Sequence, residues 1–319
     1  VGDDFSYDSK YNRTACWGNG SEGQFGNGST ASSAYAIDIV ALNDLGPPEA
    51  GDRHQCIVVS GAEARCWGGN QAYQLGDTTI VPKSSPVAVT SEQLVGSVAS
   101  TSTGNFHTCS IVSGGVQCFG YNGLGQLGDG TTTNRLHPVP VVGIPTGLSG
   151  ASQIASGGQH TCALMADQTV RCWGLNESGQ LGDATTVNRT TPVTVTGLTD
   201  AIAVTAGASF SCAVRAGGSV VCWGSDVLGQ LGDGEPRTAS STPVAVLSLS
   251  GVDAISAGEN HVCSRHTDGT VDCWGNNGQG QLGINPAYSP DVYEPRPYLP
   301  AEGLTATSIS SGADHSCAV

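Results

Sequence analysis

One segment recurs six times along the chain, and this repeat constrains the possible fold more than any other feature. Each copy has the form Cys-Trp-Gly, or Cys-Phe-Gly once, followed by a turn close to Gly-Gln-Leu-Gly. The copies begin at Cys16, Cys66, Cys118, Cys172, Cys222 and Cys273, so the period is about 50 residues. That period is too long for leucine-rich or ankyrin repeats and fits one four-stranded β-propeller blade.

Each unit divides into short strands by its alternating apolar pattern and its turn residues. In the best-formed unit we expect strands at residues 154–157, 160–164, 170–174 and 192–195. Val193 and Val195 alternate on one face of the last strand. Pro192 at its start is tolerated, because a strand start or edge has no ladder N–H to lose.

The repeat therefore predicts an all-β fold, a six-bladed β-propeller with four-stranded blades of about 50 residues. Residues 1–319 are expected to form one domain. Residues 1–10 are assigned to an N-terminal extension, residues 11–50 plus 303–319 to a shared closing blade, and residues 51–302 to five further blades. The N- and C-terminal strands share a blade in this prediction, because Cys16 lacks a preceding partner strand and Cys317 lacks a following one.

The 12 Cys residues follow the same repeat. Antiparallel strands place Cβ atoms opposite each other at bridging distance, so pairs nine or ten residues apart across a hairpin predict disulfides. Zinc sites usually use Cys two to four residues apart, so disulfides are favoured over metal binding. We expect five bonds within blades and one that closes the ring: Cys56–Cys66, Cys109–Cys118, Cys162–Cys172, Cys212–Cys222, Cys263–Cys273 and Cys16–Cys317. These bonds indicate an oxidising compartment, so a secreted or cell-surface protein is expected.

Charge and hydropathy exclude two classes of partner. The chain has 12 basic and 27 acidic residues, a net charge of −15, with no cluster of Lys and Arg. Nucleic acid binding depends on such clusters, so no nucleic acid partner is expected. No apolar run approaches the roughly 20 residues of a membrane helix, so no membrane-spanning segment is expected.

The repeat resembles that of the regulator-of-chromosome-condensation repeat family. Its consensus is Gly-x-x-His-x-Cys-Ala-Leu, then Cys-Trp-Gly-x-Asn-x-x-Gly-Gln-Leu-Gly-Asp-Gly. The match extends over essentially the whole chain from Thr14 onward. The resemblance implies a β-propeller whose ends share a blade. The family's founding nuclear member has seven blades and exchanges guanine nucleotides on a small GTPase at chromatin. The six units and the paired Cys set this chain apart, and they are similar to bacterial extracellular members, so that nuclear activity is not carried over.

Three further residue types recur once per unit, and each has a structural and a functional interpretation. A ring of His could hold a metal or an anion, but bonds from each imidazole to backbone groups of an adjacent blade are favoured. The Asp of the Gly-Asp-Gly turns could bind calcium, but ordinary turns, with Arg135, Arg189 and Arg237 near the carboxylates, are favoured. The aromatic residues could form a sugar platform, but packing between blades is favoured. The sets are His54, His107, His160, His261 and His315, with Phe210 as the sixth; Asp77, Asp129, Asp183 and Asp233; and Trp17, Trp67, Phe119, Trp173, Trp223 and Trp274.

No nucleophile constellation, metal-ligand motif or phosphate-binding loop occurs, so we expect no catalytic residues, no metal, no cofactor and no enzymatic activity. Specificity is instead expected where the copies differ, on rigidly held loops. The partner-binding candidates are Tyr73, Tyr121, Leu124, Leu175, Glu177, Asp226, Leu228, Tyr288 and Tyr293.

The leading functional hypothesis is a disulfide-linked extracellular interaction or structural module that binds a protein partner or like subunits of an assembly. One alternative is a secreted enzyme inhibitor that binds its target with one face of the propeller. A second is a carbohydrate-binding or carbohydrate-active protein, which would require carboxylates that converge in the central channel.

Overall fold

The structure is a computed structural model, and it describes residues 5–10, 13–38, 48–59, 63–90, 97–235, 238–284, 291–297 and 305–319. Within these ranges the protein is almost entirely β-structure, with a single short 3-10 helix, η1 (Gly147–Ser149). No helix in the described part of the chain has the length and hydropathy needed to cross a membrane.

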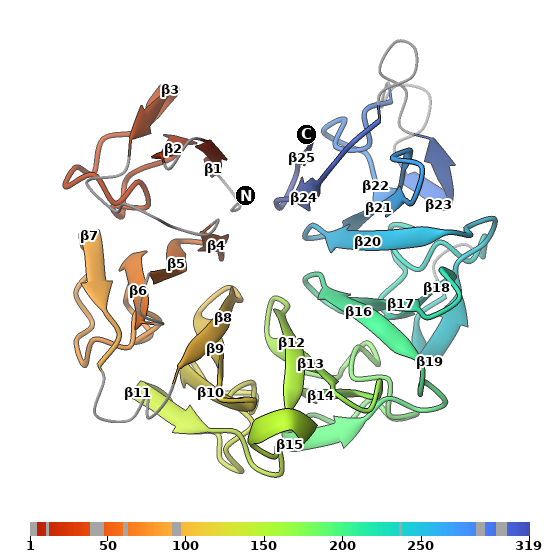
Figure 1. Cartoon of the computed structure of the whole chain (residues 1–319), viewed down its shortest axis with the longest axis horizontal. Helices are drawn as coiled ribbons and strands as arrows, with labels where there is room; N and C mark the ends of the chain where they lie inside the picture. The colour runs from red at the N-terminus through yellow and green to blue at the C-terminus, as the bar shows by residue number, and fades with distance from the viewer. Residues whose placement is uncertain are drawn as a thin grey trace.

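Five four-stranded antiparallel sheets stand side by side around a central axis, as in a β-propeller (Figure 1). In each, the first strand lies nearest the axis and the fourth lies at the periphery (Figure 1). The sheets are β4 (Glu49–Ala50), β5 (His54–Val59), β6 (Glu63–Gly68) and β7 (Lys83–Ala88); β8 (Val98–Thr103), β9 (His107–Val112), β10 (Gly115–Gly120) and β11 (Arg135–Pro140); β12 (Ala151–Ser156), β13 (His160–Met165), β14 (Val170–Gly174) and β15 (Arg189–Thr194); β16 (Ala201–Ala206), β17 (Phe210–Arg215), β18 (Val220–Gly224) and β19 (Ser240–Ala245); β20 (Val252–Ala257), β21 (His261–His266), β22 (Val271–Asn276) and β23 (Asp291–Pro297).

The ends of the chain form two further sheets, so the described residues make seven sheets where six blades were predicted. The N-terminal sheet contains β1 (Phe5–Lys10), β2 (Arg13–Gly18) and β3 (Ser33–Asp38), and the C-terminal sheet contains β24 (Ile309–Ser311) and β25 (Ser316–Ala318). Residues 5–10, assigned to an extension outside the blades, pair with β2 in the position that a second strand takes in every complete blade. Among the described residues the two ends lie in separate sheets, so the predicted shared blade is not confirmed.

The same pairing corrects the predicted Cys16–Cys317 bond. Tyr7 lies opposite Cys16 in the register of β1 and β2, where the complete blades have a second Cys. Cys317 lies opposite Ser310 in a separate sheet, and both thiols are free. Burial raises the pKa of the Cys16 thiol to about 11, although a hydrogen bond from Gln55 opposes the shift, so this thiol stays protonated at neutral pH.

Each complete blade is cross-linked between its second and third strands, as predicted. The bonds are Cys56–Cys66, Cys109–Cys118, Cys162–Cys172, Cys212–Cys222 and Cys263–Cys273. In each pair the two Cys are direct partners in the strand register, with Cα atoms 4.1–4.2 Å apart. All ten are at most 2% exposed.

The repeated aromatic residues pack between blades, also as predicted. Trp67, Trp173, Trp223 and Trp274 are fully buried, and each indole N–H donates to a Gln carbonyl of the preceding blade at 2.8–2.9 Å. Trp17, in the N-terminal sheet, is only half-buried. The buried rings cannot serve as a sugar-binding platform, and each instead joins two blades.

Side-chain oxygens join the first strands near the axis. Ser102 Oγ accepts a hydrogen bond from the Ser156 N–H, and Ser256 Oγ accepts one from the Ser311 N–H, both at 2.9 Å. Gln153 and Thr205 accept equivalent bonds from the backbone of the next blade. Neighbouring sheets do not share a backbone ladder here, so these polar side chains satisfy backbone donors that would otherwise face the channel.

A ring of glycines follows the first strands at Gly51, Gly104, Gly157, Gly207, Gly258 and Gly312. A Cβ added at Gly157 would lie 2.4 Å from the Gly207 carbonyl oxygen of the next blade and 2.3 Å from the His160 ring. The backbones of neighbouring blades therefore approach too closely for any side chain.

We expect Gly157→Ala to lower the free energy of unfolding by about 2–4 kcal/mol, because the next blade must shift to remove this overlap. Urea denaturation measures the change. Gly197→Ala is a poor control because its φ is positive, whereas Gly217 has open space and an ordinary φ, so Gly217→Ala should change stability by less than about 1 kcal/mol. Equal losses in the two variants would contradict the close-approach explanation.

Candidate functional site

Two sets of loops emerge at the same end of every complete blade, and together they form what we call the loop face. The third strand ends where the second begins, as in the pairing of Gly120 with His107. The long loop after the third strand, such as 121–134, therefore lies beside the short turn before the second, such as 104–106. Backbone bonds join them, as from Tyr121 N to the Phe106 carbonyl at 2.8 Å. The short turns line the mouth of the central channel, and the long loops lie beside them.

Four of the six long loops contain a buried Asn that the sequence analysis did not single out: Asn70, Asn122, Asn176 and Asn277. The side-chain amide of Asn176 donates to Asp183 Oδ1 at 3.1 Å and to the carbonyls of Thr185 and Val187. Its Oδ1 accepts from the Leu181 N–H at 2.9 Å. Asn70 and Asn122 make the same set of bonds in their loops. This Asn lies two residues after the Gly of the Cys-Trp-Gly or Cys-Phe-Gly segment in four of the six repeats, so its recurrence was the available signal.

The Asp residues of the turns are structural, as predicted. Asp129 and Asp183 form ion pairs with Arg135 and Arg189 at 2.6 and 2.7 Å, while Asp77 pairs with Lys83 at 3.4 Å. Burial tends to raise the pKa of the Asp129 carboxyl, but hydrogen bonds from Thr131 and Arg135 outweigh burial and hold that pKa below its usual value. Arg237, the third predicted partner, lies outside the described residues.

The repeated His residues join neighbouring blades through hydroxyl groups, where backbone partners were expected. His Nε2 lies 2.8–2.9 Å from the next blade's hydroxyl in four pairs: His54–Thr108, His107–Thr161, His160–Ser211 and His261–Ser316. The hydroxyl of Thr108 donates its proton to the Gln74 carbonyl at 2.8 Å. It must therefore accept from the imidazole, which fixes the neutral tautomer with the proton on Nε2.

The one complete blade that lacks the His also lacks the hydroxyl partner on the next blade. Phe210 replaces the His in one blade, and the residue facing it from the next blade is Val262, with no hydroxyl. Both side chains are fully buried. The His are thus an interblade packing device and not a metal ring, and no cluster of three metal-ligating side chains occurs in the described part of the chain.

Burial lowers the pKa of these imidazoles far below the ordinary value of 6.5. The pKa is about 3 for His54 and His107 and about 4 for His160 and His261. Nδ1 of His54 and His107 has no hydrogen-bond partner among the described residues, so a second proton there would be unsolvated. These His are neutral at physiological pH.

All partner-binding candidates except Tyr288 and Tyr293 lie in the long loops of the loop face. Tyr73, Tyr121, Leu124, Leu175 and Leu228 are half-buried and Glu177 is exposed. Asp226 is fully buried, because it takes the place of the loop Asn and accepts from the Leu231 N–H at 2.9 Å, so it is not a surface contact. Tyr288 lies outside the described residues, and Tyr293 belongs to β23 but its side chain is not described.

Tyr73 has an unusual backbone conformation. Its φ is +66°, in the left-handed region, where the corresponding residues of the other repeats are all Gly: Gly23, Gly125, Gly179, Gly229 and Gly280. Exposed apolar side chains lie in the same loop, at Ile80 and Val81. The loop also reaches the next blade, where the Thr78 N–H donates to the carbonyl of the exposed Leu136. A strained Tyr in the same loop as exposed apolar residues distinguishes this loop from the others of the loop face.

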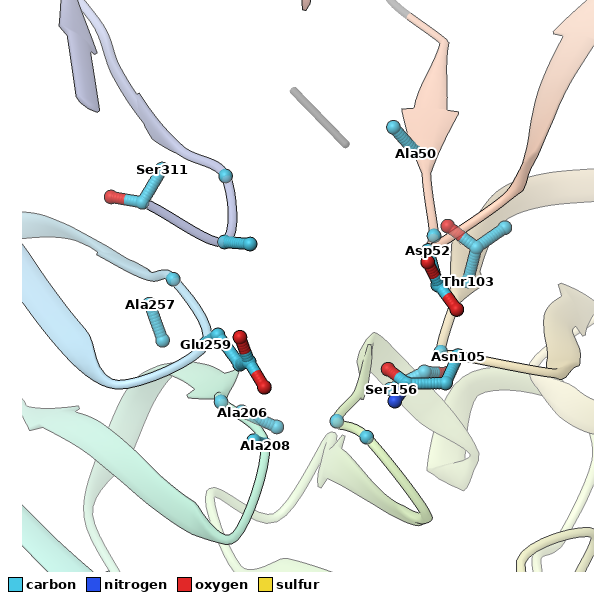
Figure 2. A pocket seen from close by; sticks show the side chains of 18 residues that line it. Ala50, Asp52, Thr103, Asn105, Ser156, Ala206, Ala208, Ala257, Glu259 and Ser311 are labelled. Atoms are coloured by element: carbon cyan, nitrogen blue, oxygen red, sulfur yellow. The ribbon is translucent and has the colours of Figure 1, made fainter. Parts of the chain in front are cut away.

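At the centre of the loop face, the channel mouth is a cavity of about 90 Å³ bounded by the glycine ring. Figure 2 shows Asp52, Thr103 and Asn105 on one side of the opening and Glu259 on the other. A second cavity of about 360 Å³ shares several lining residues with it, among them Thr103 and Ser156, and is lined mainly by Ser and Thr of the first strands. The lining of the channel is thus polar, and it contains no aromatic ring among the residues that the structure describes.

Known proteins resemble this chain in sequence and in fold. The family model "Regulator of chromosome condensation (RCC1) repeat" matches residues 66–111, 113–164, 169–214, 217–264 and 268–319, more than half of the chain. A probable E3 ubiquitin-protein ligase HERC4 of Rattus norvegicus is 31% identical over 59% of this chain and 18% of its own length. The ultraviolet-B receptor UVR8 of Arabidopsis thaliana is 32% identical over 56% of this chain and 41% of its own length. The chain thus spans less than half of these relatives.

Solved structures agree on the fold. Prp20p of Saccharomyces cerevisiae, whose reported structure concerns its binding to Gsp1p and histones, superposes with a TM-score of 0.85 at 19% identity, over 99% of this chain and 80% of that one. Human WBSCR16 superposes with a TM-score of 0.84 at 20% identity, over 99% and 85%. The repeated sheets, their loops and the sequence matches lead to one assignment: the chain belongs to the family of regulator of chromosome condensation (RCC1) repeat proteins.

Proposed function

We propose that this protein is a secreted or cell-surface interaction module that binds a protein partner with its loop face. The observation that carries the proposal is Tyr73, held in a left-handed conformation where five other repeats have Gly. Such a conformation costs roughly 1–2 kcal/mol for a residue with a Cβ. A strained aromatic side chain on a rigid frame is typical of a binding hot spot.

Three further features support this proposal. Five buried disulfides suit an oxidising compartment outside the cytosol. The relative Prp20p is described as binding Gsp1p and histones, and a structure shows it with Kap60, so this propeller type can bind proteins. Ile80 and Val81 in the same loop as Tyr73, and Leu136 in the next blade, supply exposed apolar area. A target enzyme is one kind of protein partner and falls within the proposal, whereas the buried Trp rings give carbohydrate binding less support.

The test begins with the partner captured from the native source and then purified. We expect Tyr73→Gly to weaken its binding at least tenfold, because the aromatic contact is lost. The same change should leave the free energy of unfolding within about 1 kcal/mol of wild type, because relief of strain offsets lost packing. Titration calorimetry and urea denaturation measure the two quantities.

Tyr35 provides the matched control, because it is 83% exposed but lies on the outer strand β3. Tyr35→Ala should leave binding unchanged. Unchanged binding by Tyr73→Gly, or a chain that retains no protein at all, would contradict the proposal.

A further inference from the structure

The channel mouth carries more negative charge than its own cations balance. Asp52, Glu259 and Asp314 lie on three of the short turns around the axis, and the cavity lining contains Asp52 and Glu259 but no Lys or Arg among the described residues. Arg53 lies 3.5 Å from Asp52 but also forms a 2.9 Å ion pair with Glu22. Asp314 accepts a hydrogen bond from the neutral Gln281 side chain at 3.3 Å. No ion pair of Glu259 occurs within the described ranges.

The carboxylates of the mouth affect one another. Partial burial raises the pKa of the Glu259 carboxyl, and the negative charges of Asp314 and Asp52 raise it further. Glu259 is therefore close enough to each of these two carboxylates for repulsion across the opening. A cation placed between them would relieve that repulsion.

A buried hydroxyl in the same opening also lacks a partner. Thr103 is 7% exposed, lines both cavities, and its Oγ1 has no hydrogen-bond partner among the described residues. It lies on the same side of the opening as Asp52, facing Glu259 across the axis (Figure 2). Burial of a hydroxyl without a hydrogen-bond partner costs free energy, and a bound ligand that supplies this hydrogen bond would remove the cost.

The shape of the opening restricts the ligand. The glycine ring keeps the mouth free of side chains, because a Cβ at Gly104 or Gly258 would lie 2.5 or 2.3 Å from the next blade's carbonyl oxygen. A cavity of about 90 Å³ admits a linear chain but not a sugar ring. No group of three His, Cys, Asp or Glu suited to a metal ion occurs in the described parts of the chain, so a metal is disfavoured.

We propose that the channel mouth receives a lysine side chain from the bound protein partner, whose ammonium group lies between Glu259 and Asp52 and donates to Thr103. An ammonium group has three diverging donors, which suits acceptors on different sides of an opening better than the planar fork of arginine. This inference rests on the proposed function, because the mouth lies at the centre of the loop face. It adds that the partner presents a Lys at the propeller axis.

The test uses the full chain and two small probes, Nα-acetyl-lysine methylamide and its uncharged analogue Nα-acetyl-norleucine methylamide. We expect the lysine probe to cause saturable NMR shifts of the glycine-ring amides with a dissociation constant on the order of millimolar, typical of one small charged group. The norleucine probe should cause none. Calcium chloride at the same concentrations should neither reproduce the shifts nor displace the lysine probe.

Variants then assign the contacts. Glu259→Gln should weaken lysine binding at least tenfold, and Thr103→Val, which keeps the side-chain shape, should weaken it severalfold. Asp268→Asn makes the same charge change in the same blade, but in the hairpin at the opposite end, and should have no effect. Equal responses to both probes, saturation by calcium instead of lysine, or normal binding by Glu259→Gln would overturn the proposal. If the lysine probe does not bind but Tyr73→Gly weakens partner binding, the loop-face proposal stands and the lysine site is rejected. If the lysine probe binds but Tyr73→Gly has no effect, the lysine site stands and the role of Tyr73 is rejected.

Discussion

Lowering the pH from 7.5 to 5 is expected to remove roughly 8 kcal/mol of stability through four buried His, about 2 kcal/mol from each. The folded protein holds His54, His107, His160 and His261 with pKa values of about 3–4, whereas the unfolded chain protonates them near 6.5. Below pH 6.5 the unfolded state therefore binds more protons. Their contribution is fully present above pH 6.5 and is lost as the pH falls toward 4.

Urea denaturation between pH 5 and 7.5 measures this effect, and its slope against pH gives the number of protons taken up on unfolding. The chain itself supplies the matched variant. Changing His160→Phe together with Ser211→Val copies the natural pair Phe210 and Val262. This double variant should fold and take up about one proton fewer at pH 5. An unchanged slope would show that these His are not the groups that titrate.

Full reduction of the disulfides is expected to unfold the protein. Each bond closes a loop of 9 or 10 residues, and the chain-entropy model assigns such a loop about 2.7 kcal/mol. Five bonds then contribute roughly 13 kcal/mol, comparable to the whole stability of a typical domain of 5–15 kcal/mol. Reduction of the native protein should nevertheless be slow, because the bonded Cys are at most 2% exposed.

Single bonds can be tested separately. Cys162→Ala with Cys172→Ala should lower the free energy of unfolding by about 2–3 kcal/mol, as measured in urea. Cys317→Ser is the control, because this Cys is exposed and unbridged, so its removal should change stability by less than about 0.5 kcal/mol. A loss of several kcal/mol in the control would reveal a bond that the structure does not contain.

The parts of the fold that could be predicted from sequence are those set within one repeat. The 50-residue period gives the blade, and the short spacing of Cys162 and Cys172 gives a hairpin bond, because both depend on neighbouring strands alone. The predicted shared blade at the chain ends was not confirmed, and its Cys16–Cys317 bond is absent, because the prediction followed the Cys residues alone. Tyr7 stands nine residues before Cys16, the same spacing as Cys109 and Cys118, so a second strand without Cys was present in the pattern.

The candidate site was predicted less well, because it depends on contacts between blades. The partner of His107 lies 54 residues away at Thr161, and only the paired loss at Phe210 and Val262 signals it in sequence. The strain at Tyr73 is a property of the backbone. The sequence shows it only when the six repeats are aligned, because the other five have Gly at this position. Glu259 and Asp52 line opposite sides of the channel mouth because the blades are arranged in a circle, which no local pattern encodes.

Every disulfide described here lies inside a blade, and none joins one blade to the next. A chain pulled from its two ends would therefore unfold one blade at a time, because only non-covalent contacts hold neighbouring blades together. The disulfide of each blade would keep its hairpin closed, so the 9 or 10 residues between the two Cys could not extend. A force–distance trace should then show a sawtooth whose steps lengthen by roughly 30 Å per blade when a reductant is added.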